Sequence, residues 1–230
     1  MSIEMGGLQH LFITSVIAAT DVQYVARTSK GPRYEGLYLP QSLADRSCGL
    51  LCVLQAAMLL CELPRTHVAS VATSRREPLR GLWRLAREAY FEGTTESEIE
   101  AYVNAFSPAL TCTTVTSQSA KRVGPLVAKA IRAGHVPMVR FDSQHWCHWC
   151  LVLGLEKMAG EPLPRALLLL DPSASQPWGS FYNARLELQT KAGPSVRAKQ
   201  PYTLPYRFVT GEAWAVRLNG LVIVKRGQAP

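Results

Sequence analysis

The sequence lacks any apolar run long enough to cross a membrane, since no stretch approaches about 18 uninterrupted apolar residues. It also lacks a basic start, because the apolar run at residues 11–19 is preceded by an acidic residue and by no Lys or Arg. We therefore expect a soluble protein without a membrane span or a secretory signal. Such a protein would work in the cytoplasm or be delivered into another cell without a cleaved signal peptide.

A long basic tract is absent too, although 25 Lys and Arg against 17 Asp and Glu leave a net charge of +8. Because these basic residues are spread along the chain, the sequence does not favour a nucleic-acid partner. The charge suits an acidic protein partner, which arginines on an amphipathic helix expected over residues 78–91 would bind. Ordinary solvation of that helix face is the alternative interpretation.

Neither internal repeats nor low-complexity segments divide the chain. With 230 residues, 47% of them apolar, it can bury one substantial core, so we expect a single domain over residues 1–230. Helical patterns dominate residues 41–133, and strand patterns dominate residues 134–226. This order predicts an α+β fold in which a buried central helix packs on a C-terminal, mainly antiparallel sheet.

Local signals place most of the individual elements. Thr95 and Glu98 predict a capping box that opens a short helix, and Gly124-Pro125 predicts the first turn of a helix ending near Ala133. Asn219-Gly220 predicts a two-residue hairpin between strands at 214–218 and 221–225. The other expected strands are Leu110–Thr116, Val136–Phe141, Trp149–Leu155 and Ala166–Leu170.

Six cysteines would suggest a disulfide framework, but their positions argue against one. Three of them share one apolar segment, and Cys48 and Cys52 lie one helical turn apart on the same face, where a bridge rarely fits. We therefore expect free thiols and a reducing compartment.

The apolar segment Cys48–Cys61 predicts the buried central helix, since Gln55 is its only clearly polar residue. Cys48 would sit in the first turn, where unpaired N–H groups and the helix dipole favour a negative charge. A thiol there is biased toward the thiolate, the form that attacks carbonyl carbon. Gly49 follows it and would leave room for a substrate to approach.

Three elements would converge on this thiol if the expected topology is right. His148 opens a strand and would accept the proton of Cys48, which turns the thiol into a ready nucleophile. Asp171 ends the next strand and would orient the imidazole through its other nitrogen. Gln41 lies in the loop that leads into the helix, and its amide N–H₂ would hold the oxyanion beside the backbone N–H of Cys48.

Each of these assignments has an alternative. Cys48 could be a buried core thiol. His145 is the alternative to His148, since each is followed by a tryptophan, but only His148 leads directly into the apolar strand. Asp142 and Asn183 are substitutes for Asp171 as the orienting group.

The rival chemistry is a zinc site. Four potential ligands lie within six residues, namely His145, Cys147, His148 and Cys150. No second C-x-x-C or distant His pair completes the pattern, and on a strand Cys147 and Cys150 would face opposite sides of the sheet. We therefore expect no metal and no other cofactor.

These residues resemble those of a known family. Gln41, Ser47-Cys48-Gly49 before an apolar helix, the strand from His148 to Gly154, and Asp171-Pro172 look like the papain-like cysteine peptidases. The similarity is greatest to the compact bacterial branch that includes the leader-cleaving peptidase domains of peptide exporters. Two departures are Ser47, where that branch commonly has Asp, and a longer gap between His148 and Asp171.

The resemblance implies a papain-like fold and a thiol hydrolase that cleaves peptide or isopeptide bonds through an acyl-enzyme. In that family Cys48 would be the nucleophile, His148 the general base, Asp171 the orienting group and Gln41 the oxyanion donor. A protein or peptide would be the substrate, and no metal would take part. Two alternatives keep this fold: an acyltransferase or transglutaminase-like enzyme with the same triad, and a binding module without turnover.

Overall fold

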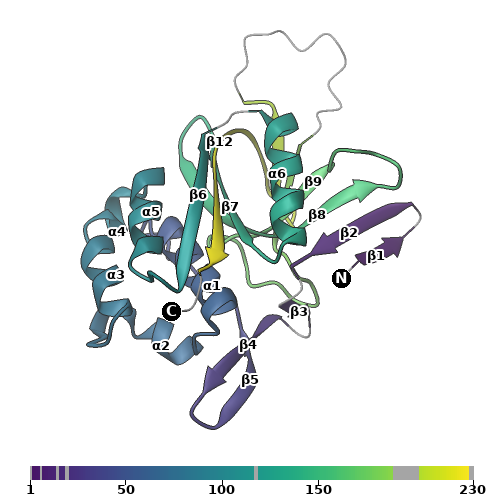
Figure 1. The fold of residues 1–230 in the computed structure, drawn as a ribbon. Coiled ribbons are helices and arrows are strands. Elements are labelled where there is room, and N and C mark those ends of the chain that lie inside the picture. Colours follow the sequence, from purple (N-terminus) through teal and green to yellow (C-terminus); the bar gives the residue numbers. More distant parts are fainter. Residues whose placement is uncertain are drawn as a thin grey trace.

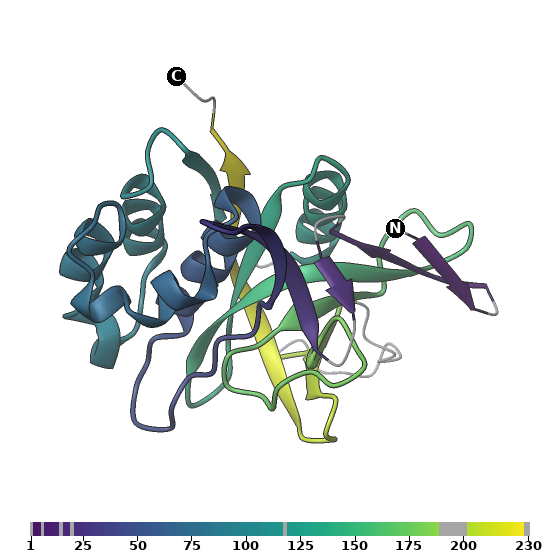
Figure 2. The same ribbon diagram turned by 90° about the horizontal axis from the view of Figure 1, so that it is seen from below.

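The computed structural model describes residues 2–5, 7–13, 16–18, 21–116, 119–188 and 202–227. It is a mixed α/β fold with a sheet-dominated core, against which helices pack. Helices α2 to α5 gather at the side of the molecule away from the β1–β2 hairpin (Figure 1, Figure 2). Within the described ranges, no helix has the length and apolar character that crossing a bilayer requires.

The helices are α1 (Cys48–Cys61), α2 (Arg65–Ala69), α3 (Leu79–Ala86), α4 (Ala89–Glu92), α5 (Glu96–Asn104) and α6 (Ala120–Arg132), with a 3-10 turn at Val71–Thr73. The strands before α1 are β1 (Ser2–Met5), β2 (Leu8–Phe12), β3 (Val16–Ala18), β4 (Val22–Thr28) and β5 (Gly31–Gly36). Those after it are β6 (Leu110–Thr116), β7 (Val136–Asp142), β8 (Cys147–Met158), β9 (Ala166–Leu170), β10 (Ala184–Glu187), β11 (Leu204–Phe208) and β12 (Ala213–Arg226).

The main sheet has nine strands in the order β1-β2-β8-β7-β12-β11-β10-β9, and β6 pairs with β12 beside this path. Because β9 also pairs with β8, the strands from β8 round to β9 close into a ring. A closed ring brings strands that are far apart in the sequence close together. The remaining strands, β3 to β5, form a separate three-stranded antiparallel sheet.

The central helix is confirmed at its predicted bounds. Helix α1 packs on β8, and every one of its residues is buried except Leu51 and Cys61, which are partly exposed. The capping box of α5 is confirmed as well: Glu98 N–H donates to the Thr95 hydroxyl, and Thr95 N–H donates to the Glu98 carboxylate. Strands β6 and β9 also have their predicted bounds.

The hairpin predicted at Asn219-Gly220 is wrong, because β12 runs through these residues as one strand. The pairing of β12 with β7 shifts register between Leu218 and Gly220, so the two residues form a bulge and not a turn. Asn219 donates to Asp142 at 2.7 Å, and a Cβ at position 220 would lie 2.7 Å from Glu96 Oε1. A side chain at position 220 would therefore have to displace the Glu96 carboxylate.

Strands β1 to β5 precede the segment 41–133, in which helices were expected and in which α1 to α6 lie. Two other expectations are corrected. The helix expected over 78–91 is divided into α3 and α4. Helix α6 begins at Ala120, ahead of Gly124-Pro125, because burial of Val123 and Val127 in the core continues its apolar face through the proline.

Gln55 lies fully buried in the middle of α1, and neither of its side-chain polar atoms has a hydrogen-bond partner among the described residues. A buried amide without partners destabilises the fold. We therefore expect Gln55→Met, which has a similar volume, to raise the free energy of unfolding by about 1–2 kcal/mol in urea titration. Gln55→Glu is the control and should lower it, because the new charge is buried; equal stability of the three proteins would contradict this account.

Candidate active site

The loop that leads into α1 is organised by a buried carboxylate. Asp45 Oδ1 accepts from the backbone N–H of Ser47 at 3.0 Å and from its hydroxyl at 2.5 Å, and Oδ2 accepts from the backbone N–H and hydroxyl of Ser42. Burial acts to raise the pKa of Asp45, but these hydrogen bonds outweigh it and lower the pKa below its usual value. The ionised Asp45 thus fixes the turn that places Cys48 at the first position of α1.

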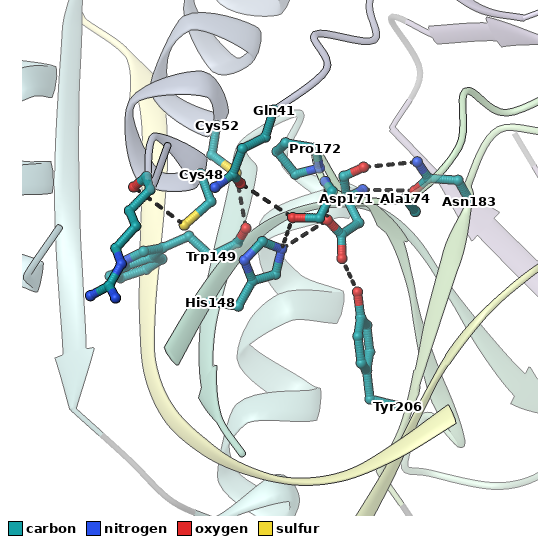
Figure 3. A network of polar contacts seen from close by, with 12 residues as sticks. Gln41, Cys48, Cys52, His148, Trp149, Asp171, Pro172, Ala174, Asn183 and Tyr206 are labelled. Carbon is teal, nitrogen blue, oxygen red and sulfur yellow. Dashed lines mark hydrogen bonds and ion pairs between the residues drawn. The ribbon is translucent and has the colours of Figure 1, made fainter. Parts of the chain in front are cut away.

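His148 and Asp171 come from two neighbouring strands. His148 is the second residue of β8, and Asp171 follows the last residue of β9. Because these strands pair with Leu151 opposite Leu170, the two side chains meet, and His148 Nε2 lies 2.8 Å from Asp171 Oδ1 (Figure 3). The contact is buried, since Asp171 has 0% and His148 8% of its surface exposed.

The structure brings Cys48 to the opposite side of the same imidazole ring (Figure 3). Burial acts to raise the pKa of the Cys48 thiol, but the hydrogen bond and charge of His148 outweigh it, so the pKa lies below its usual value. Burial likewise acts to lower the pKa of His148, but the charge of Asp171 outweighs it and holds that pKa well above its usual value. Both shifts favour a thiolate–imidazolium pair.

Gln41 connects the Cys48 loop to the Asp171 loop. Its backbone N–H donates to the Pro172 carbonyl at 2.8 Å, and its side-chain Nε2 donates to the Asp45 carbonyl at 2.7 Å. Its Oε1 accepts from the Ser173 hydroxyl at 3.2 Å, which fixes the direction of the amide. One Nε2 hydrogen is left for a further acceptor, and the side chain lies beside Cys48 (Figure 3).

The alternatives to His148 and Asp171 lie in other surroundings. His145 is exposed in the loop before β8, and Asp142 accepts from Asn219 and Arg217. Asn183 does not reach the imidazole: its Oδ1 accepts from Asp171 N–H at 2.7 Å, and its Nδ2 donates to the Asp171 carbonyl. It therefore holds the backbone of Asp171.

Two residues that contact Asp171, Ser173 and Tyr206, carried no signal in the sequence. Ser173 N–H donates to Asp171 Oδ1 at 2.6 Å, and the Tyr206 hydroxyl donates to Oδ2. Cys150 lies beside His148, and burial, followed by the charge of Asp171, raises the pKa of its thiol. Gly49 does not open the site as expected, because a Cβ there would lie 2.8 Å from Thr94 Cβ; it makes room for packing.

The four-ligand zinc cluster is not assembled. Cys147 is exposed and Cys150 is buried, because residues three positions apart on a strand face opposite sides of the sheet. A different trio, His148, Cys150 and Asp171, has ligand atoms within 4.8 Å of one another. We nevertheless expect a chelator to leave melting temperature and activity unchanged, because both carboxylate oxygens of Asp171 already accept hydrogen bonds, from Ser173 and Tyr206. Elemental analysis checks this; one equivalent of zinc lost together with the fold would contradict it.

Comparison with known proteins leaves the family open. No family model matches the chain, and no curated protein is similar to it in sequence. One matching solved structure is described as the crystal structure of UfSP from C. elegans, with 13% identity and a TM-score of 0.45. The match covers 94% of this chain and 35% of that chain, so this chain spans about a third of the length of the protein it matches. A likeness of this size assigns neither a family nor an activity.

Proposed function

We propose that this protein is a cysteine peptidase with a papain-like domain over residues 1–230, and that Cys48, His148 and Asp171 are its catalytic residues. The observation that carries the proposal is the buried contact between His148 Nε2 and Asp171 Oδ1, with the Cys48 thiol on the other side of the ring. A thiol beside an imidazole that a buried carboxylate orients is the arrangement that nucleophilic acyl transfer needs.

In the first half of the reaction, the Cys48 thiolate attacks the carbonyl carbon of the amide and forms a tetrahedral intermediate. His148 then gives its proton to the leaving amine, the C–N bond breaks, and a thioester remains on Cys48. In the second half, His148 takes a proton from water, which attacks the thioester carbonyl. Collapse releases the carboxylic acid and restores the thiolate, so no electrons or metal ions are exchanged.

Gln41 is proposed to stabilise the oxyanion of both tetrahedral intermediates. Its amide is held on both sides, by Asp45 and by Ser173, so its remaining N–H keeps one direction. A fixed donor stabilises developing negative charge without reorganising during the step. The backbone N–H of Cys48, in the first turn of α1, is proposed as the second donor.

A protein or peptide is the proposed substrate, and an acidic one suits the arginines of α3. Arg84 of α3 and Arg87, which directly follows the helix, are exposed, and Arg80 is paired with Glu77 at 2.8 Å. The proposal also retains the resemblance to the leader-cleaving bacterial branch and a site of action in the cytoplasm or in a recipient cell.

A peptide pool incubated with the protein tests the reaction. The incubation is run with and without a primary amine. Pairs of fragments whose masses sum to the parent peptide plus one water support the peptidase. Products that carry the added amine would show an acyltransferase instead. A protein that forms neither product, and whose Cys48 reacts slowly with iodoacetamide at pH 6, would be a binding module.

The rate of cleavage should depend on pH in both directions, because the pKa of Cys48 is lowered and that of His148 is raised. It should fall at low pH as the Cys48 thiolate gains a proton, and at high pH as the His148 imidazolium loses one.

A further inference from the structure

Tyr206 reaches the site from β11 and lies 35 residues after Asp171 in the sequence. The ring closure of the sheet brings it there, since β11 pairs with β10 on one side and with β12 on the other. Its hydroxyl donates a hydrogen bond to Asp171 Oδ2, on the side of the carboxylate away from His148 (Figure 3).

This hydrogen bond completes the surroundings of a carboxylate that water does not reach. Asp171 Oδ1 accepts from Ser173 N–H at 2.6 Å and meets His148 Nε2 at 2.8 Å. Among the described residues, the hydrogen-bond donor to Asp171 Oδ2 is the Tyr206 hydroxyl. Asp171 has 0% and Tyr206 1% of its surface exposed, so solvent does not replace this donor if it is lost.

The direction of the Tyr206 hydroxyl is set by the packing of its ring. The ring centroid lies 4.6 Å from that of Phe141 and 5.8 Å from that of Trp214. Phe141 stands opposite His148 in the β7–β8 pairing, so one aromatic cluster supports both partners of Asp171. The hydroxyl therefore has little freedom to find another acceptor.

We propose that Tyr206 is a positioning residue that holds the Asp171 carboxylate against His148 and thereby keeps the proton on His148 and the thiolate on Cys48. This inference rests on the function proposed above. Without the tyrosine hydroxyl, Oδ2 of Asp171 would be a buried acceptor with no donor among the described residues, which is costly. The carboxylate would turn toward another donor, and the His148 imidazolium would lose the partner that holds its charge. His148 would then be neutral, and Cys48 would lose the positive charge that favours its thiolate.

Other titratable groups face His148 and Asp171, and a test of Tyr206 has to leave their side chains unchanged. They are Cys48 and Cys52 from α1, Cys150 from β8 and Tyr38 from the segment before α1. Tyr206→Phe changes none of these groups and retains the ring that packs in the aromatic cluster. The rate at which iodoacetamide alkylates Cys48, followed from pH 5 to pH 9 by mass spectrometry of the full chain, reports the thiolate without a substrate.

For Tyr206→Phe, we expect alkylation of Cys48 at pH 6 to slow by about tenfold, which corresponds to a rise of about one unit in the pKa of the thiol. The rates at pH 9 should equal those of the unchanged protein, because the thiol is ionised there in both. Tyr24→Phe is the matched control, since Tyr24 has 1% of its surface exposed and its hydroxyl lies against the Leu63 carbonyl and the Glu35 carboxylate, away from the site. It should leave the pH profile unchanged even if it lowers the melting temperature.

Asp171→Asn gives a second control, because with no carboxylate present, adding Tyr206→Phe should not move the profile further. If Tyr206→Phe does not fold, 3-fluorotyrosine at position 206 replaces it; as a stronger donor it should move the profile to lower pH. An unchanged profile in the variant that folds overturns the role of Tyr206. Slow alkylation of the unchanged protein at pH 6 would instead overturn the proposed function itself, so the two failures are distinguishable.

Discussion

Cys48→Ala should abolish turnover while leaving the fold intact. The Cys48 sulfur is the atom that would form the thioester, and alanine offers no nucleophile in its place. The stability cost should stay below about 1 kcal/mol, because the change removes one sulfur atom at the end of a helix whose other residues hold it in the core. Peptide cleavage measures the first effect, and urea unfolding of the same preparation measures the second.

Cys52→Ala is the matched control, one turn further along the same helix. Its thiol is fully buried and lies 3.5 Å from the Trp149 carbonyl, and burial, followed by the charge of Cys150, raises the pKa of that thiol. The variant should lose about 1–2 kcal/mol of stability and keep most of its activity. If Cys48→Ala unfolds the protein and Cys52→Ala inactivates it, the two assignments are reversed.

His148→Ala should lower kcat by at least about a thousandfold, the usual cost of removing a member of a triad. The imidazole lies between the Cys48 thiol and the Asp171 carboxylate and bonds to the latter (Figure 3), so its loss separates them. Asp171→Asn should have an intermediate effect, because an amide still holds the ring but stabilises the imidazolium less well. Rates are compared after circular dichroism has shown that each variant is folded.

His145→Ala is the control for the histidine. This residue is exposed in the loop before β8, and its backbone N–H donates to the Ser143 hydroxyl at 3.1 Å. Its replacement should cost less than about tenfold and act on substrate binding, since the side chain is outside the buried contact. An inactive His145→Ala beside an active His148→Ala would reject the proposed triad.

The sequence by itself determined the elements whose signals are local. The apolar run from Cys48 to Cys61 has no solvent-facing side, so it forms a buried helix wherever the rest of the chain lies. Thr95 and Glu98 satisfy the orphan N–H groups of α5 within four residues. The positions of Cys48, His148 and Asp171 at the ends of such elements were equally visible, because each follows or begins a run of apolar residues.

Tertiary structure alone decided which of these ends meet and what surrounds them. Asn219-Gly220 has the strongest local preference for a turn, yet β12 continues through it because the strand has partners on both sides. The sheet closes into a ring because β8 pairs with β9 and β10 pairs with β11. No single segment of the sequence encodes these pairings. Tyr206 donates to Asp171 only because of that closure, since contacts between residues this far apart in the sequence depend on the whole fold.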